Sequence, residues 1–425
     1  MYSRHLNTVE TGMANAHASF MGSSQVVTLI YIDHKIDETE CQRIFTQYCL
    51  DNPILLSKLI VNGDKWYVKR DKTLHNPSFN TFRMDYHLPK FDTILRKEVN
   101  DILDHSSELT RLRIIYLQKN IGCLLILTQH HAIADTFSAK QVLSHILSSV
   151  DNSKQQHSFE HMPVWHPTVP CRRCEDDLHS DISNTSNIVP LHKALYKINN
   201  PTPTPVTNLH SWIINRNELK ALDHYSKASN VSLNSLLTSI FSLAVMDVLH
   251  IRSINTYSAV SLRKKNKDLT EIGCKLEIAD INIQMSDIAT AAQLFEKRMH
   301  AIKNAIPREA EEDSLIPANH IPQHINRQNA INGCEGLGFT NGGKTENLLT
   351  QPDIHILAYR SVANRTSGSL LFTFHFSFHL GTLVITAVFS ELILSAEQSK
   401  IFIENAHRII HSIAMAYTSP VAYEI

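Results

Sequence analysis

One stretch of the chain joins a strongly apolar strand directly to two histidines and then to an amphipathic helix. Residues 122–129 (GCLLILTQ) form an apolar run of strand length, which predicts a buried strand. Residues 138–150 (SAKQVLSHILSSV) space their apolar side chains with the helical period. His130 and His131 therefore lie where a core strand ends, and Asp135 follows just before the helix begins. Loops at such junctions hold functional groups rigidly, so the sequence predicts a functional site here.

The histidine pair allows three interpretations. A neutral imidazole has an unperturbed pKa of about 6.5 and can act as a general base at neutral pH. In a chain with 25 histidines, a histidine four residues before an aspartate also arises by chance, so both histidines can be ordinary loop residues. A metal site would use His131 and Asp135 as ligands, but the flanks offer only Thr128, Gln129 and Thr136 as further ligands.

Strand and helix patterns occur in two sets, separated by a stretch rich in Pro, Ser, Asn and Asp. We expect an α+β protein with a first lobe at 1–165, a connector at 166–207 and a second lobe at 208–425. The connector carries a predicted short helix at 191–197. The sequence further predicts strands at 26–32, 66–70, 109–117, 210–216 and 254–263, a strand pair within 369–390, and helices at 38–50, 91–105, 138–150, 217–229, 231–249, 287–306 and 395–415.

The predicted strand pair shows the clearest two-residue alternation. Phenylalanines at 372, 374, 376 and 378 alternate with small or polar residues. Successive side chains of a strand point to opposite faces, so this pattern predicts one aromatic face.

Composition limits the class of protein and its surroundings. The chain of 425 residues is 43% hydrophobic and 19% charged with a net charge of −1, which is typical of a folded globular protein. Nothing in this balance favours a nucleic acid or an anionic membrane as partner. The longest apolar run, at 240–249, is too short for a transmembrane segment, and the first twenty residues lack the apolar stretch of a secretory signal. Seven scattered cysteines suggest reduced thiols, so we expect a cytoplasmic location.

The segment around the histidine pair also resembles a motif of a known protein family. Residues 128–147 (TQHHAIADTFSAKQVLSHIL) resemble the HHxxxDG motif of condensation domains and their stand-alone acyltransferase relatives, the chloramphenicol-acetyltransferase-like superfamily. That superfamily includes nonribosomal peptide condensation domains, polyketide-associated acyltransferases, alcohol acetyltransferases and the plant BAHD enzymes. Weaker likenesses follow in the family's order over nearly the whole chain: 4–17, 51–60, 109–117, 231–245, 258–265, 272–274 and 338–343. Thr136 replaces the motif's glycine, and the DFGWG box of the plant branch is absent.

The resemblance implies two chloramphenicol-acetyltransferase-like lobes in a V-shaped pseudo-dimer, with the active site in the tunnel between them. It implies transfer of an acyl group from a thioester to a hydroxyl or amine, with His131 as general base and His130 mainly structural. Asp135 would hold the loop by pairing with Arg263, and Asn341 would line the site or serve as a turn residue. No cofactor or metal is implied, because acyl-coenzyme A or an acyl carrier protein serves as co-substrate. We expect a monomer.

Two alternative functions stay open, and two further segments contain residues that could bind a metal ion or an anionic partner. The chain can be a non-catalytic relative that binds a partner or lipid, or a metal-dependent hydrolase. His166, Cys171, Cys174 and His179 have zinc-ligand residue types, although a polar loop explains them as well. The basic segment 262–267 (LRKKNK) suits coenzyme A phosphates or an acidic carrier protein, but equally a solvated loop.

Overall fold

The computed structural model describes residues 3–418 apart from 72, 75, 85–89, 118–121, 151–188, 264–271, 306–315, 346–347, 349 and 351. Its strands are β1 (Ser3–His5), β2 (Gln25–Ile32), β3 (Ser57–Asn62), β4 (Lys65–Arg70), β5 (Ser78–Met84), β6 (Thr110–Leu117), β7 (Cys123–His130), β8 (Thr207–Ile214), β9 (Ser253–Ser261), β10 (Leu276–Gln284), β11 (Gly336–Lys344), β12 (Ile356–Ala363), β13 (Leu370–His379) and β14 (Thr382–Ser390). Its helices are α1 (Thr8–Ser19), α2 (Glu38–Asp51), η1 (Pro53–Leu56), α3 (Phe91–Val99), α4 (Thr136–Ser149), α5 (Leu191–Tyr196), α6 (Arg216–Ala228), α7 (Leu233–Leu249), α8 (Ile288–Ala305), α9 (Arg327–Asn332) and α10 (Ala396–Thr418). The predicted α+β class is confirmed.

The first lobe is built on a five-stranded sheet with strand order β12-β2-β7-β6-β5. The strand that leads to the histidine pair, β7, lies between the antiparallel strands β2 and β6, and all of its residues are buried. Leu125 and Leu127 pack toward α2 and α4 on one face, whereas Leu124 and Ile126 face the other core. Both faces of β7 are covered, which explains why its sequence is continuously apolar rather than alternating.

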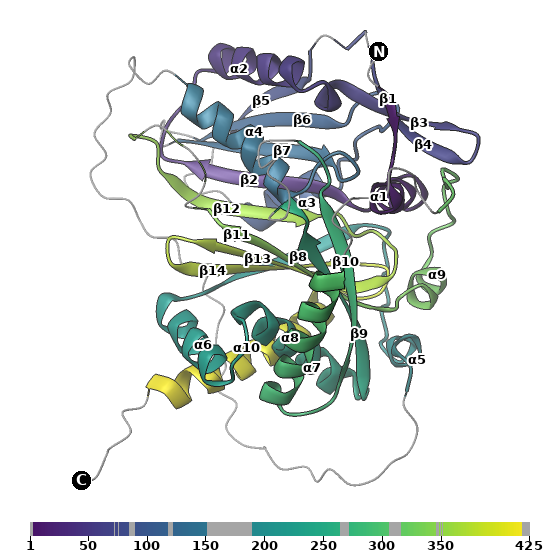
Figure 1. The fold of residues 1–425 in the computed structure, drawn as a ribbon, viewed down its shortest axis with the longest axis vertical. Helices are drawn as coiled ribbons and strands as arrows, with labels where there is room; N and C mark the ends of the chain where they lie inside the picture. Colours follow the sequence, from purple (N-terminus) through teal and green to yellow (C-terminus); the bar gives the residue numbers. More distant parts are fainter. Residues whose placement is uncertain are drawn as a thin grey trace.

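The second lobe is built on a six-stranded sheet with strand order β10-β9-β11-β13-β14-β8. Figure 1 shows α6, α7, α8 and α10 together on the side of this sheet that points away from the first lobe. Phe372, Phe374 and Phe376 of β13 all lie in this core, and the rings of Phe374 and Phe241 of α7 are 4.6 Å apart. The predicted aromatic face of β13 is therefore confirmed, and its opposite face is left for polar side chains that point toward the first lobe.

The two lobes share a third core, in which α3 lies between the sheets. Phe91 and Leu95 of α3 pack with Ile126 of the first sheet and with Leu209 and Val388 of the second. The lobes are thus joined by apolar contacts as well as by the chain itself.

One strand crosses from the second half of the chain to the first lobe. β12 pairs antiparallel with β2, for example at Tyr359 opposite Ile30, and so forms an edge of the five-stranded sheet (Figure 1). Tyr359 packs into the core beside α4, whereas Val362 packs into the core shared by the lobes. The prediction assigned residues 208–425, and therefore β12, to the second lobe. The hydrogen bonds of β12 with β2 place this strand in the sheet of the first lobe instead. Pairing between strands distant in the sequence leaves no local pattern, so the residues alone did not indicate this exchange.

Other elements differ from the sequence prediction at their ends. The helix predicted at 91–105 ends at Val99, and the backbone N–H of Leu103 donates instead to the side chain of Gln25. Arg263 lies two residues beyond β9, although the prediction placed it inside that strand. α1 and β10 were not predicted, because α1 has little apolar periodicity and depends on the capping box of Asn7 and Glu10.

The predicted connector is only partly described. Its residues 189–207 carry α5 where the short helix was expected, whereas the His and Cys residues at 166–179 lie outside the described residues. Among the described helices, no single one is long and apolar enough to cross a membrane; the bent pair α6 and α7 passes only by length and composition, and α7 is a core helix.

Candidate active site

A cavity of about 310 Å³ lies where the two lobes meet, and His131 forms part of its wall. β7 delivers this residue: the strand ends at His130, and a short loop follows before α4 begins at Thr136. The first lobe contributes α1 and the loop after it, and the second lobe contributes β9, β10, β11 and β13. The lining side chains are mostly apolar, with polar groups at Ser24, His131, Thr136, Tyr257, Thr340, Ser361, Arg365, Ser369, Thr373 and His375.

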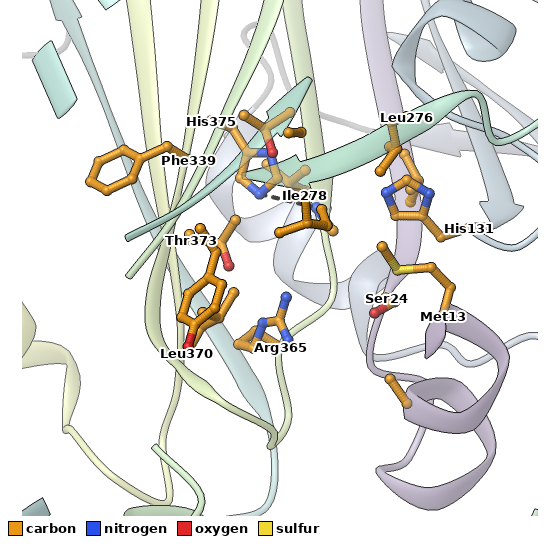
Figure 2. Close-up of a pocket in the computed structure, with 18 of the residues that line it drawn as sticks. Met13, Ser24, His131, Leu276, Ile278, Phe339, Arg365, Leu370, Thr373 and His375 are labelled. Atoms are coloured by element: carbon orange, nitrogen blue, oxygen red, sulfur yellow. Dashed lines mark hydrogen bonds between the residues drawn. The ribbon is translucent and has the colours of Figure 1, made fainter. Parts of the chain in front are cut away.

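The surroundings of His131 favour the neutral form of its imidazole ring. Burial lowers its pKa below 6.5, while backbone carbonyl contacts and the negative charge of Asp135 act in the opposite direction. Its Nδ1 lies 3.8 Å from Sγ of Cys274, on the second lobe. In Figure 2 a ring nitrogen of His131 points across the cavity toward Arg365 and His375. The ring therefore presents a neutral nitrogen to any molecule in the cavity.

His130 has a different environment from its neighbour. It is fully buried, its Nδ1 accepts a hydrogen bond from the backbone N–H of Ala132, and its ring lies 4.2 Å from the ring of His17 in α1. Burial and the neighbouring His17 and His105 place its pKa well below 6.5. His130 thus shapes the loop and contacts the helix that forms one wall of the cavity.

Asp135 and Arg263 form the ion pair that the resemblance implied. Nε of Arg263 donates to Oδ2 of Asp135 at 3.1 Å, and Nη2 donates to Oδ1 at 3.0 Å. The guanidinium group also donates to the carbonyl oxygen of Gly273 at 2.7 Å, and Arg263 is 2% exposed. Asp135 caps α4 by accepting from the N–H of Ser138. One carboxylate therefore fixes the helix start, the histidine loop and the contact between the lobes.

The second-lobe wall contains polar residues that the sequence analysis did not identify. His375 lies on β13, where its Nε2 accepts from the N–H of Ala363 at 3.3 Å, and burial lowers its pKa to about 3. Burial also lowers the pKa of Arg365 to about 10. Thr373 and His375 alternate with the phenylalanines of β13, so the same two-residue period that identified the aromatic face marks them as residues of the opposite face. Arg365 stands in a loop and left no such signal.

Asn341 is not brought to the cavity. It is exposed on β11, its Oδ1 accepts from the N–H of Gly343, and its amide group donates to Asn234 at 3.3 Å. The neighbouring Thr340 lines the cavity instead, because adjacent residues of a strand face opposite sides. The structure thus favours the interpretation of Asn341 as a turn residue.

Metal binding was another of the three interpretations of the histidine pair. Within the described residues, no group of three or more His, Cys, Asp or Glu side chains is arranged to hold a metal ion. Both carboxylate oxygens of Asp135 are already engaged by Arg263. The local arrangement therefore suits a charge-paired loop rather than a ligand set.

Comparison with known proteins gives a consistent result for the fold. No protein-family model and no curated sequence matches the chain. Among solved structures, polyketide synthase associated protein 5 from Mycobacterium tuberculosis is similar with a TM-score of 0.64 and 15% identity, over 98% of this chain and 100% of that one. The condensation domain of the monacolin K polyketide synthase gives a TM-score of 0.65 and 10% identity, over 98% of both chains.

The epimerization domain from the third module of tyrocidine synthetase B is also similar, with a TM-score of 0.60, 12% identity and 97% of both chains covered. At such identities the likeness concerns the path of the chain and its two lobes. The chain therefore has the fold of these condensation and epimerization domains.

Proposed function

We propose that the protein is an acyltransferase that moves an acyl group from a thioester to a hydroxyl or amine acceptor, with His131 as the general base. The observation that carries this proposal is the position of His131, whose neutral imidazole faces the cavity between the lobes. Its loop is fixed by the buried pair of Asp135 and Arg263. The similar condensation domains support the same class of reaction.

The proposed reaction has two proton transfers at one nitrogen. The cavity-facing nitrogen of His131 takes the proton of the acceptor as its oxygen or nitrogen attacks the thioester carbonyl. The tetrahedral intermediate then collapses, the carbon–sulfur bond breaks, and the thiolate receives the proton from the imidazolium. Proton transfer of this kind contributes roughly 10²- to 10⁴-fold in rate, and holding both substrates in one cavity contributes further.

The donor thioester is acyl-coenzyme A or an acylated carrier protein. The similar structures include condensation domains of a polyketide synthase and of the calcium-dependent antibiotic synthetase, which supports the carrier protein as a donor and an amide-forming condensation as a variant of the same chemistry. A binding protein without activity is the alternative outcome of the experiment below.

Thiol release from acyl donors tests the proposal. Wild-type protein and His131→Ala are incubated with short- to long-chain acyl-coenzyme A and with acylated carrier protein, and free thiol is measured. His224→Ala, which removes an exposed histidine of α6, is the matched control. We expect release by the wild type and the control, and a loss of at least about 100-fold in His131→Ala.

Equal release by wild type and His131→Ala would contradict the proposed role of His131. Absence of release from every donor, carrier-bound ones included, would identify a binding protein instead of an enzyme.

A further inference from the structure

Among the described residues that line the cavity, Arg365 is the one Lys, Arg, Asp or Glu, and it is charged at neutral pH. No Asp or Glu belongs to that lining, and within the described residues no acceptor oxygen is paired with the guanidinium group of Arg365. Its Nε is buried without a hydrogen-bond partner. Enclosing a charge without a partner is costly, and buried charges in proteins are normally paired. An unpaired cation in the wall of a cavity is a suitable partner for an anionic group of a bound ligand.

A second polar group without a partner lies on the same wall. The hydroxyl oxygen of Thr373 is buried and makes no hydrogen bond, although most buried hydroxyl groups do. Figure 2 shows Arg365 and Thr373 directed into the space that His131 faces from the other lobe. Nε2 of His375 accepts from the N–H of Ala363, so the proton of this neutral ring is on Nδ1, and the ring has no negative charge with which to neutralise Arg365.

The charge and shape of this wall favour a carboxylate. A single guanidinium matches one carboxylate in charge and binds it through two parallel N–H groups. A phosphate dianion would keep one uncompensated charge among apolar neighbours such as Leu370 and Phe339. A cavity of about 310 Å³ accommodates a small acyl chain or acceptor that ends in such a group.

We propose that Arg365 and Thr373 form a carboxylate-binding subsite, so that one of the two substrates carries a carboxylate. This inference rests on the proposed function for the identity of the substrates. The carboxylate belongs either to the acyl chain, as in a dicarboxylic acyl thioester, or to the acceptor, as in a hydroxy acid or an amino acid. In both cases it is held on the wall opposite His131, which leaves the reacting end near the imidazole.

Binding of matched probes tests the subsite without any turnover. Calorimetry on His131→Ala compares glutaryl-coenzyme A with pentanoyl-coenzyme A, which carry identical phosphates and differ in the terminal carboxylate. Two acceptor pairs are measured in the same way: 3-hydroxybutanoate with 3-hydroxybutanamide, and valine with valinamide. We expect the carboxylate member of one pair to bind about 10- to 100-fold more tightly than the member without the carboxylate. The pair that shows this preference identifies the source of the carboxylate.

The same measurements with Arg365→Gln, Arg365→Lys and Thr373→Val in the His131→Ala background assign the preference to the wall. We expect Arg365→Gln to abolish it, Arg365→Lys to retain part of it, and Thr373→Val to reduce it. Arg360→Gln is the matched control, because Arg360 is a buried arginine of β12 outside the cavity lining, and the preference should persist in it.

Equal affinity for the members with and without the carboxylate in all pairs, the absence of any binding included, overturns the subsite. An Arg365→Gln variant that weakens both members of a pair equally overturns it as well. No binding measurement requires catalysis. An Arg365-dependent preference together with absent thiol release would therefore retain the subsite and reject the acyl transfer. Thiol release that depends on His131, without any preference for the carboxylate, would retain the acyl transfer and reject the subsite.

Discussion

At the scale of single residues, Asp135 holds the histidine loop in place through its ion pair with Arg263. Asp135→Asn would keep the helix-capping oxygen but leave the charge of Arg263, which is 2% exposed, without its counter-ion. We expect a loss of about 3–5 kcal/mol in the free energy of unfolding, measured by urea denaturation. Glu40→Gln removes one partner of the exposed pair with Arg43 and should cost less than about 1 kcal/mol. A comparable small loss in both variants would show that the buried pair is not the element that secures the loop.

The proposed role of His131 as general base predicts how activity depends on pH. A general base must be neutral, and burial lowers the pKa of His131 below 6.5. The acid limb of kcat/KM should therefore have its midpoint below pH 6.5. Measuring kcat/KM across pH 4.5–8 with the best donor checks this expectation. An acid limb above pH 6.5 would place the titrating base elsewhere.

At the scale of elements, the start of β7 depends on close contact with β2. Gly122 has φ +122°, and a Cβ atom there would lie 2.1 Å from the carbonyl oxygen of Ile32. Gly122→Ala should therefore shift the pairing of β7 with β2 and lower the free energy of unfolding by about 2 kcal/mol or more. Gly63→Ala is the control, because Gly63 also has positive φ, +63°, but its Cβ meets nothing within 4 Å. Denaturation midpoints compare the two, and equal losses would indicate that backbone strain alone is responsible.

Most elements near the site could be predicted because their periods are local. The apolar run of β7, the helical period of α4 and the alternation of β13 each follow from side-chain direction within one element. The end of α3 and the existence of β12 depended on partners instead: Gln25 binds the backbone after α3, and β2 supplies the ladder for β12. Such partners are distant in the sequence, so no local period records them.

At the scale of the whole molecule, several buried histidines make stability depend on pH. Burial lowers the pKa of His17 to about 4 and that of His375 to about 3, whereas an unfolded chain titrates near 6.5. Between pH 6.5 and 4 the unfolded state binds more protons, so stability is complete above pH 6.5 and falls as the pH decreases. Each such histidine contributes a slope of up to about 1.4 kcal/mol per pH unit. Unfolding by urea at pH 7, 6 and 5 checks this, and His17→Gln should reduce the slope; a stability that does not change over this range would contradict it.

The sequence by itself determined the two sets of strands and helices, the aromatic face of β13 and the junction that presents His131. These features depend on neighbours within a few residues, whose spacing is written directly in the chain. Only the tertiary structure decided that β12 joins the first lobe, that Asn341 faces away from the cavity and that Arg365, Thr373 and His375 face His131. The physical reason is that a cavity between two lobes is formed by segments far apart in the chain, and whether a charge such as that of Arg365 has a partner is known only when all of its surroundings are in place.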